Sequence, residues 1–205
     1  MRILVEIHTS SPILDKSSDE PFTITLFARV DHDRPITINA LMTVLYSQVT
    51  ALDYLGLTFK KTTTGTYAER REFYCLLEPP ERLTATTDSV VQLSPRDAEE
   101  AYTVSHTFQR LPEWVPDLSS DKSLSDEQKE LAAGVSQIRD QTKGLEPGHS
   151  YEIGLGTQMS SVRAWREGSK AEVFLRGSLA SGALTATSLS MELVNAATFR
   201  VVDGG

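Results

Sequence analysis

The feature of this sequence that most constrains its fold is a run of alternating apolar and polar residues near the N-terminus. Within 22–30, apolar side chains occupy every second position: Phe22, Ile24, Leu26, Ala28 and Val30. Successive side chains of a β-strand point to opposite faces, so this period of two predicts a strand with one face toward a core.

Further candidate strands, several with the same alternation, follow along the chain and are separated by clusters of Gly, Pro, Asn and Asp, which favour turns. They are 2–8, 36–40, 72–77, 89–93, 101–108, 151–155, 162–166, 171–175 and 184–202, the last split near Asn195. The run 36–40 follows 22–30 after the short polar break Asp31–Pro35. We therefore expect these two runs to be adjacent strands.

Many short strands with few helices between them predict an all-β fold. We expect an antiparallel β-sandwich of about seven to nine strands, as one domain over 1–205. One helical insertion is expected within 112–144. Its helix begins at Ser125, because Ser125 and Gln128 have the spacing of a capping box, and Gly144 is suited to end it.

Composition excludes several classes of function. Lys and Arg total 20 against 28 Asp and Glu, a formal charge of -8, so nucleic acid is not expected as a partner. No run has the length of a membrane span and no signal peptide is visible, which predicts a cytoplasmic protein. The single cysteine, Cys75, lies among apolar residues and is expected to be a buried thiol.

Catalytic motifs are weak in this chain. It has no G-x-S-x-G, no phosphate-binding loop and no H-E-x-x-H pattern, so we expect no cofactor, no metal, and a protein that is not an enzyme. The alternative is a metal-dependent or acid–base enzyme that uses five residues brought together by the fold. These are Asp31, Asp33, His106, His149 and Glu152. A cleft containing all of them would be required, whereas His106 alone on an apolar strand face is typical of a core residue.

Trp and Arg dominate the energetically important positions of protein interfaces. Arg163, Trp165 and Arg166 stand together in one predicted strand, and Trp114 lies in the Pro-rich loop. These four residues are the candidate binding site of a non-enzymatic protein-binding or scaffold module, which could also use a sheet edge. Packing of Trp165 over the sandwich edge is the structural alternative. A carbohydrate or small apolar ligand is a further alternative, and it would need an aromatic-lined pocket. The mixed cluster Glu69–Glu72 is expected to be solvated.

Three stretches, 22–38, 145–156 and 163–173, together resemble a group of fungal proteins of unknown activity. The order of the pieces is also similar to the amino-terminal sandwich of arrestins, in which an early strand pair is followed much later by a Leu-x-x-Gly-x-x-Tyr strand. Here that motif is Leu145 to Tyr151. The charge pattern of the arrestin polar core is absent. The resemblance implies an immunoglobulin-like or arrestin-like β-sandwich and no particular activity.

Overall fold

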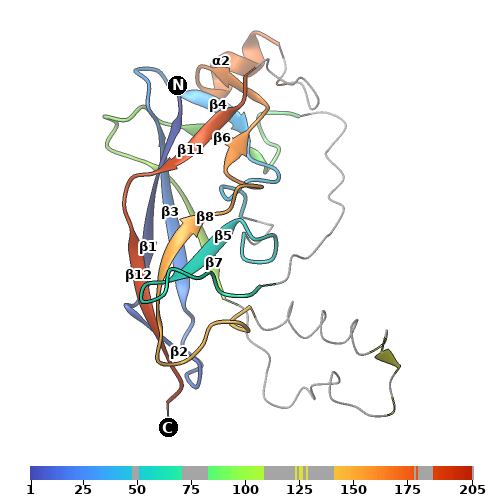
Figure 1. Ribbon diagram of the computed structural model, residues 1–205. Coiled ribbons are helices and arrows are strands. Elements are labelled where there is room, and N and C mark those ends of the chain that lie inside the picture. Colours follow the sequence, from blue (N-terminus) through green and yellow to red (C-terminus); the bar gives the residue numbers. More distant parts are fainter. Residues whose placement is uncertain are drawn as a thin grey trace.

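The computed structural model describes residues 1–47, 51–70, 83–108, 141–177 and 187–204, with Ser123, Ser125, Asp126, Gln128 and Leu179. Within these residues the chain forms twelve strands and a six-residue helix, α2 (Lys170–Leu175). The strands are β1 (Ile3–Thr9), β2 (Ile13–Asp15), β3 (Thr23–Val30), β4 (Ile36–Asn39), β5 (Leu57–Lys61), β6 (Val90–Leu93), β7 (Tyr102–Thr107), β8 (Ser150–Leu155), β9 (Ser161–Val162), β10 (Trp165–Glu167), β11 (Leu189–Leu193) and β12 (Ala197–Val202). Figure 1 shows their arrangement, with the two chain ends at opposite ends of the molecule.

The strands form three sheets, so the predicted all-β fold is confirmed. A five-stranded sheet has the order β7-β3-β1-β11-β9, a four-stranded sheet the order β2-β12-β8-β5, and a three-stranded sheet the order β10-β4-β6. The expectation of purely antiparallel sheets is wrong for two pairs, because β1 runs parallel to β11 and β2 runs parallel to β12. Distant parts of the chain form both parallel pairs, as parallel pairing requires a long connection.

The alternation that predicted the first strand is fully realised in β3. Its even-numbered residues are buried and its odd-numbered residues only partly so. Each buried aliphatic side chain of this kind contributes about 1.5–3 kcal/mol by leaving water. The same alternation in β1 buries Ile3, Val5 and Ile7. These two strands therefore present one continuous apolar face to the core.

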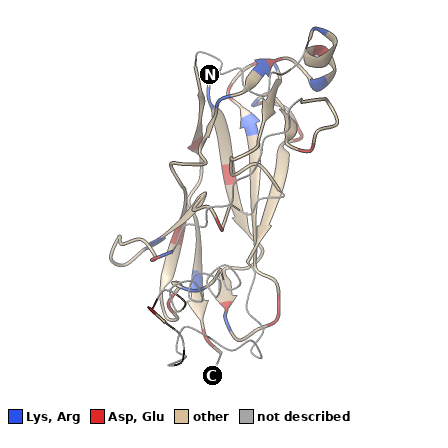
Figure 2. Cartoon of the chain, turned by 90° about the vertical axis from the view of Figure 1, so that its right-hand side faces the viewer, with Lys and Arg blue, Asp and Glu red and all other residues tan. Residues whose placement is uncertain are grey.

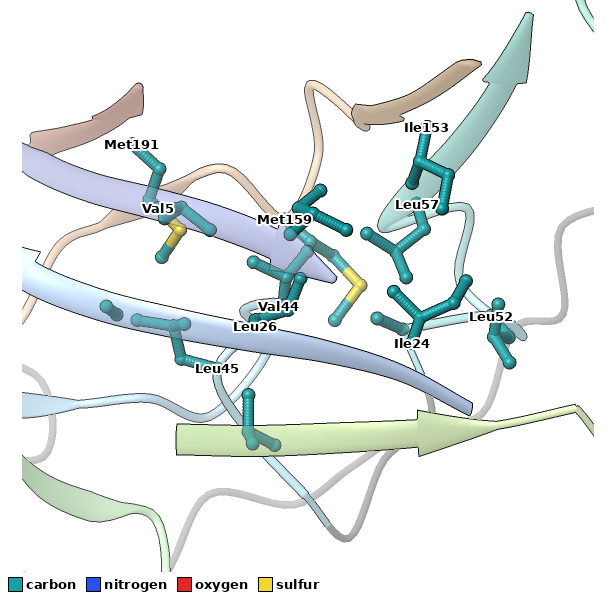
Figure 3. Close-up of a cluster of buried hydrophobic side chains, with 14 of the residues drawn as sticks. Val5, Ile24, Leu26, Val44, Leu45, Leu52, Leu57, Ile153, Met159 and Met191 are labelled. Carbon is teal, nitrogen blue, oxygen red and sulfur yellow. The ribbon is translucent and has the colours of Figure 1, made fainter. Parts of the chain in front are cut away.

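One hydrophobic core joins the three sheets. Its buried residues come from the five-stranded sheet (Ile24), the four-stranded sheet (Phe59) and the three-stranded sheet (Ile38). Figure 3 shows part of it, in which Val44 and Leu45 of the β4–β5 connection lie among the strand residues. That connection is thus a component of the core.

The expected pairing of 22–30 with 36–40 is wrong. Strand β3 lies between β1 and β7, whereas β4 lies between β10 and β6 in another sheet. The chain leaves the first sheet at Asp31, whose carboxylate binds the guanidinium groups of Arg2 and Arg96 at 3.0 Å each. A short polar break is compatible with a hairpin or with a change of sheet, and here tertiary ion pairs accompany the change of sheet.

The region 162–175 also differs from its prediction as two short strands. Residues 161–162 and 165–167 are separate strands of different sheets, because the chain bends between them. Residues 170–175 form α2 instead of a strand. Gly168, with φ +118°, turns the chain, and Ser169 and Glu172 then form a complete capping box at the helix start.

The predicted split of the C-terminal run near Asn195 is confirmed. The chain passes from β11 in the five-stranded sheet to β12 in the four-stranded sheet. At the crossing, the Asn195 side chain accepts a hydrogen bond from Ile7 N–H at 2.8 Å and donates one to Ile7 C=O at 2.7 Å. The amide side chain thereby replaces the strand neighbour that β1 loses where β11 ends.

Most of the expected insertion over 112–144 lies outside the described residues, as do Trp114 and Cys75. The start of its helix is described: Gln128 N–H donates to Ser125 Oγ, and Ser125 N–H donates to Gln128 Oε1. The predicted capping box is therefore confirmed. The single-domain organisation stays a prediction.

Candidate functional site

The outer edge of β7 is the longest open strand edge in the described part of the chain. Phe108 N–H donates to Phe22 C=O, which shows that the even-numbered residues of β7 direct their backbone groups toward β3. In an antiparallel pair the bonding direction alternates residue by residue. The backbone groups of Thr103, Ser105 and Thr107 therefore point away from the sheet. Figure 3 shows β7, in light green, beside β3, and β7 is the edge strand of its sheet.

Among the described residues, these outward N–H and C=O groups have no hydrogen-bond partner. Thr103, Ser105 and Thr107 are exposed, and no residue of β7 is an acid, a lysine, an arginine or a proline. Natural proteins usually protect sheet edges with charges, prolines or bulges. We call the outward backbone and side-chain groups of these three residues the β7 edge.

Hydroxyl groups line the outer face of the sheet beside this edge. The hydroxyls of Thr23 and Thr107 are 2.8 Å apart, and those of Thr25 and Ser105 are 3.0 Å apart. Each pair joins directly opposite residues of β3 and β7. These cross-strand hydroxyl pairs fix the orientation of the side chains next to the open backbone groups.

The inner side of β7 is held rigidly by the β4–β5 connection. His106 is 1% exposed, and its Nε2 lies 2.8 Å from Val44 C=O, while Ala51 N–H donates to its Nδ1 at 3.4 Å. Because Nδ1 accepts, Nε2 carries the proton and donates to Val44. Tyr102 Oη also donates to Leu45 C=O at 3.1 Å. His106 is therefore a satisfied core residue that fixes the strand.

Burial lowers the pKa of His106, and the hydrogen bond to the Val44 carbonyl opposes this effect in part. The neutral ring is thus the form that fits the site. A protonated ring would place an N–H at Nδ1 against the Ala51 N–H, and both would be donors.

Arg70 and Gln141, which the sequence did not indicate, also hold this connection. Arg70 donates to Leu52 C=O and lies over the Phe59 ring, with 5.1 Å between guanidinium carbon and ring centroid. Gln141, which is 2% exposed, donates to the Asp53 carboxylate. The side chains that bind 51–53 therefore come from three distant parts of the chain.

Arg70 corrects the expectation that the charges of Glu69–Glu72 are all solvated. Its terminal Nη1 is buried and has no hydrogen-bond partner among the described residues, although the residue as a whole is only half-buried. Burial lowers the pKa of Arg70 to about 10, and the Asp53 carboxylate acts in the opposite direction. Such a guanidinium stays charged at neutral pH and serves as a fixed cation of the core.

The remaining edges are shorter or already paired. Strands β2, β9 and β10 have two or three residues and β6 has four. The edge of β5 is covered by its own hairpin, since Ala68 N–H donates to Phe59 C=O and Lys61 N–H donates to Thr66 C=O. The β7 edge is therefore the best template for another strand in the described part of the chain.

The predicted binding residues Arg163, Trp165 and Arg166 lie where the chain bends from β9 to β10. Both arginines are exposed. Trp165 packs against the core and its Nε1–H donates to Thr187 C=O at 3.0 Å. The indole is therefore an anchor of the β10 edge, and the arginines are the groups that a partner could reach. Figure 2 shows charges of both signs around nearby α2.

The five residues of the enzyme alternative have separate local environments. Asp31 binds Arg2 and Arg96, and His106 is buried behind β7. His106 lies opposite Ile24, at the far end of β3 from Asp31, so about 20 Å of strand separates them. Asp33 is exposed in the turn after β3. The carboxylates of Asp31 and Asp33 therefore do not lie beside His106.

His149 pairs with Glu146, an acid outside the five residues of the enzyme alternative. Its Nε2 lies 3.4 Å from Glu146 Oε2, and Lys61 Nζ binds the same carboxylate oxygen at 2.8 Å. The hydrogen bond from Lys61 lowers the pKa of Glu146. Glu152 is exposed, opposite Lys60 and Thr198 in the sheet. This group is an ion-paired turn of the four-stranded sheet.

The described residues contain no group of three or more His, Cys, Asp or Glu that could hold a metal ion. They also contain no helix long and apolar enough to cross a membrane. Comparisons with family models, curated proteins and solved structures gave no match for this chain. The interpretation therefore rests on the geometry of the molecule.

Proposed function

We propose that this protein is a non-enzymatic binding module that takes up an extended segment of a partner protein along the β7 edge. The observation that carries the proposal is the row of outward backbone groups at Thr103, Ser105 and Thr107, with which no described residue pairs. An added strand would gain main-chain hydrogen bonds there, which is the basis of recognition by β-strand addition.

The rigid support of β7 favours this function over a loose edge. His106 and Tyr102 hold the strand from within, and the hydroxyl pairs of Thr25 and Thr23 hold it from the outer face. A preorganised edge loses little conformational freedom when a partner binds, so more of the interaction energy is available as affinity. We also propose that its fold is a β-sandwich of the immunoglobulin or arrestin type.

Proline at Ser105 tests the proposal with little damage to the sheet. The Ser105 N–H points outward, so Ser105→Pro removes a donor of the edge without removing a bond to β3. Ser105→Ala is the matched control, because it also loses the hydroxyl pair with Thr25 but keeps the N–H.

The measurement is photo-crosslinking in cells from a benzoylphenylalanine placed at Thr107, with the same probe at exposed Thr198 as the position control. We expect cross-linked proteins from position 107 that Ser105→Pro abolishes and Ser105→Ala retains. Cross-links that Ser105→Pro leaves unchanged would remove the β7 edge as the binding site.

A second candidate surface is the β10 edge with Arg163, Trp165 and Arg166. The exposure of both arginines beside outward backbone groups of Trp165 and Glu167 favours it. The double substitution of Arg163 and Arg166 by alanine tests this surface and spares the anchoring indole. We expect loss of partner binding if this edge is the site, with Ser105→Pro then having no effect. Carbohydrate or small-ligand binding stays a prediction.

A further inference from the structure

We infer that the strand best suited to the β7 edge is β7 of a second copy of this chain. The two strands would pair antiparallel about a two-fold axis that runs between the two copies of Ser105. This inference rests on the proposed function and names its partner. The two copies would join their five-stranded sheets into one continuous sheet.

The symmetry of the edge supports this partner. Closed two-fold interfaces place the same patch on both copies, so each residue faces the residue at the same distance on the other side of the axis. About Ser105, the outward residues read Thr, Ser, Thr, and the axis places Thr103 opposite Thr107 of the other copy and Ser105 opposite itself. Each outward N–H then faces an outward C=O, as in an ordinary antiparallel ladder.

The absence of charge on β7 supports it as well. In this pairing a charge at residue 105 would lie opposite its own copy, and like charges at 103 and 107 would also face each other, which destabilises cross-strand pairs. The chain carries a formal charge of -8, yet no Asp, Glu, Lys or Arg lies within β7. His106, whose pKa is lowered by burial, faces the core of its own copy. Pairing of two β7 strands would therefore bring no like charges of β7 together, although the chain as a whole is acidic.

The hydroxyl pairs continue across the proposed axis. In each copy Thr25 already pairs with Ser105 through side-chain oxygens 3.0 Å apart. Pairing of two Ser105 residues would create a row of four hydroxyls across four strands. Cross-strand Thr and Ser pairs of this kind favour one register over its neighbours.

The first test measures mass in solution by sedimentation over a wide range of protein concentration. We expect a monomer–dimer equilibrium, which Ser105→Pro shifts to monomer and Ser105→Ala retains. A monomer at every concentration overturns the inference, and so does a dimer that Ser105→Pro leaves intact. Thermal unfolding of each variant shows whether it is folded.

The second test fixes the register by disulfide formation in a Cys75→Ala background, which removes the only native cysteine. Opposite residues of a bonded antiparallel pair have Cα atoms about 5.5 Å apart, within disulfide range. Ser105→Cys should cross-link with itself. Thr103→Cys should not, but should cross-link when mixed with Thr107→Cys. Self-linking at 103 in place of 105 overturns the proposed axis.

These results separate the inference from the proposed function. If the chain is monomeric but Ser105→Pro still abolishes photo-crosslinks to other proteins, the β7 edge binds a different protein and only the two-fold pairing is wrong. If both the dimer and the cross-links persist in Ser105→Pro, the edge itself is not the binding site.

Discussion

Strands β7 and β5 are both edge strands with outward backbone groups, but only those of β5 are covered by another described segment. Each strand ends its sheet and directs the backbone groups of alternate residues outward. At β5 the chain folds back, and residues 66–68 pair with the strand through Ala68 N–H and Lys61 N–H. At β7 no described residue pairs with the outward groups.

The side chains follow the same division. Strand β5 ends in Lys60 and Lys61, which are unfavourable neighbours for another strand, whereas β7 exposes only hydroxyls. Since described residues cover the β5 edge but not the β7 edge, exposure is particular to β7 and is not common to both edge strands. The predictions below change one side of this comparison at a time.

The largest effect is expected from proline at Val104, next to Ser105. The Val104 N–H bonds toward β3, so Val104→Pro removes a ladder bond and a side chain that is 4% exposed. We expect a loss of at least about 3 kcal/mol in the free energy of unfolding. Ser105→Pro should cost about 1 kcal/mol or less. Urea denaturation measures both, with Val104→Ala as the control for side-chain loss. Equal losses at 104 and 105 would contradict the assigned outward direction.

Removal of the His106 ring should lower the free energy of unfolding by about 3 kcal/mol in His106→Ala, because buried Val44 C=O and Ala51 N–H lose their partners. Since burial lowers the folded-state pKa below the ordinary 6.5, the unfolded chain binds the proton first as pH falls. Stability should therefore decrease below about pH 6.5 and level off below the folded-state pKa.

Denaturation at several pH values measures this effect. His106→Gln, which can donate and accept, should remove the His106 contribution to the pH dependence, and His8→Gln at an exposed position should retain it. An unchanged profile in His106→Gln would show that another group titrates.

Loosening the cover of β5 should have a smaller effect. Gly65 has φ +73° in the covering hairpin, a conformation that costs an L-residue about 1 kcal/mol. Gly65→Ala should therefore destabilise the protein by about that amount. Amide hydrogen exchange should accelerate at Lys61 and Ala68, which donate across the hairpin, and stay unchanged in β7. Faster exchange in β7 would show that the two edges are coupled.

The smallest effect concerns the hydroxyl pair of Thr25 and Ser105. Cross-strand pairs of this kind contribute about 0.2–1 kcal/mol. A double-mutant cycle with Thr25→Ala and Ser105→Ala should give a coupling energy in this range by urea denaturation. Zero coupling would mean that the 3.0 Å contact does not orient the face beside the β7 edge.

Local patterns in the sequence predicted the strands well. Alternation identified β1, β3 and β7, and it placed His106 on the inner face with its apolar neighbours. These predictions hold because the side-chain direction of a strand depends only on residue parity. The split at Asn195 was likewise predicted from local residue types.

Sheet membership was not predicted, since the partners of a strand depend on distant residues. The polar residues 31–35 gave no sign that β3 and β4 belong to different sheets. The buried guanidinium of Arg70 was missed for a related reason: its hydrogen bond to Leu52 and its position over Phe59 require the folded chain. The prediction of a strand over 171–175, where the chain forms α2, was wrong for a different reason. Ser169 and Glu172 have the same capping spacing that identified the helix start at Ser125, so local residue types did indicate a helix here.

The parallel pairing of β1 with β11 has a mechanical consequence. The first strand of the chain lies beside one of its last two, and Asn195 extends their bonding to Ile7. A pull between the two chain ends, which Figure 1 shows at opposite ends of the molecule, would slide these strands along each other. Their hydrogen bonds would then bear the load together rather than open one after another. The protein should accordingly resist stretching more strongly than a hairpin pulled apart from its open end.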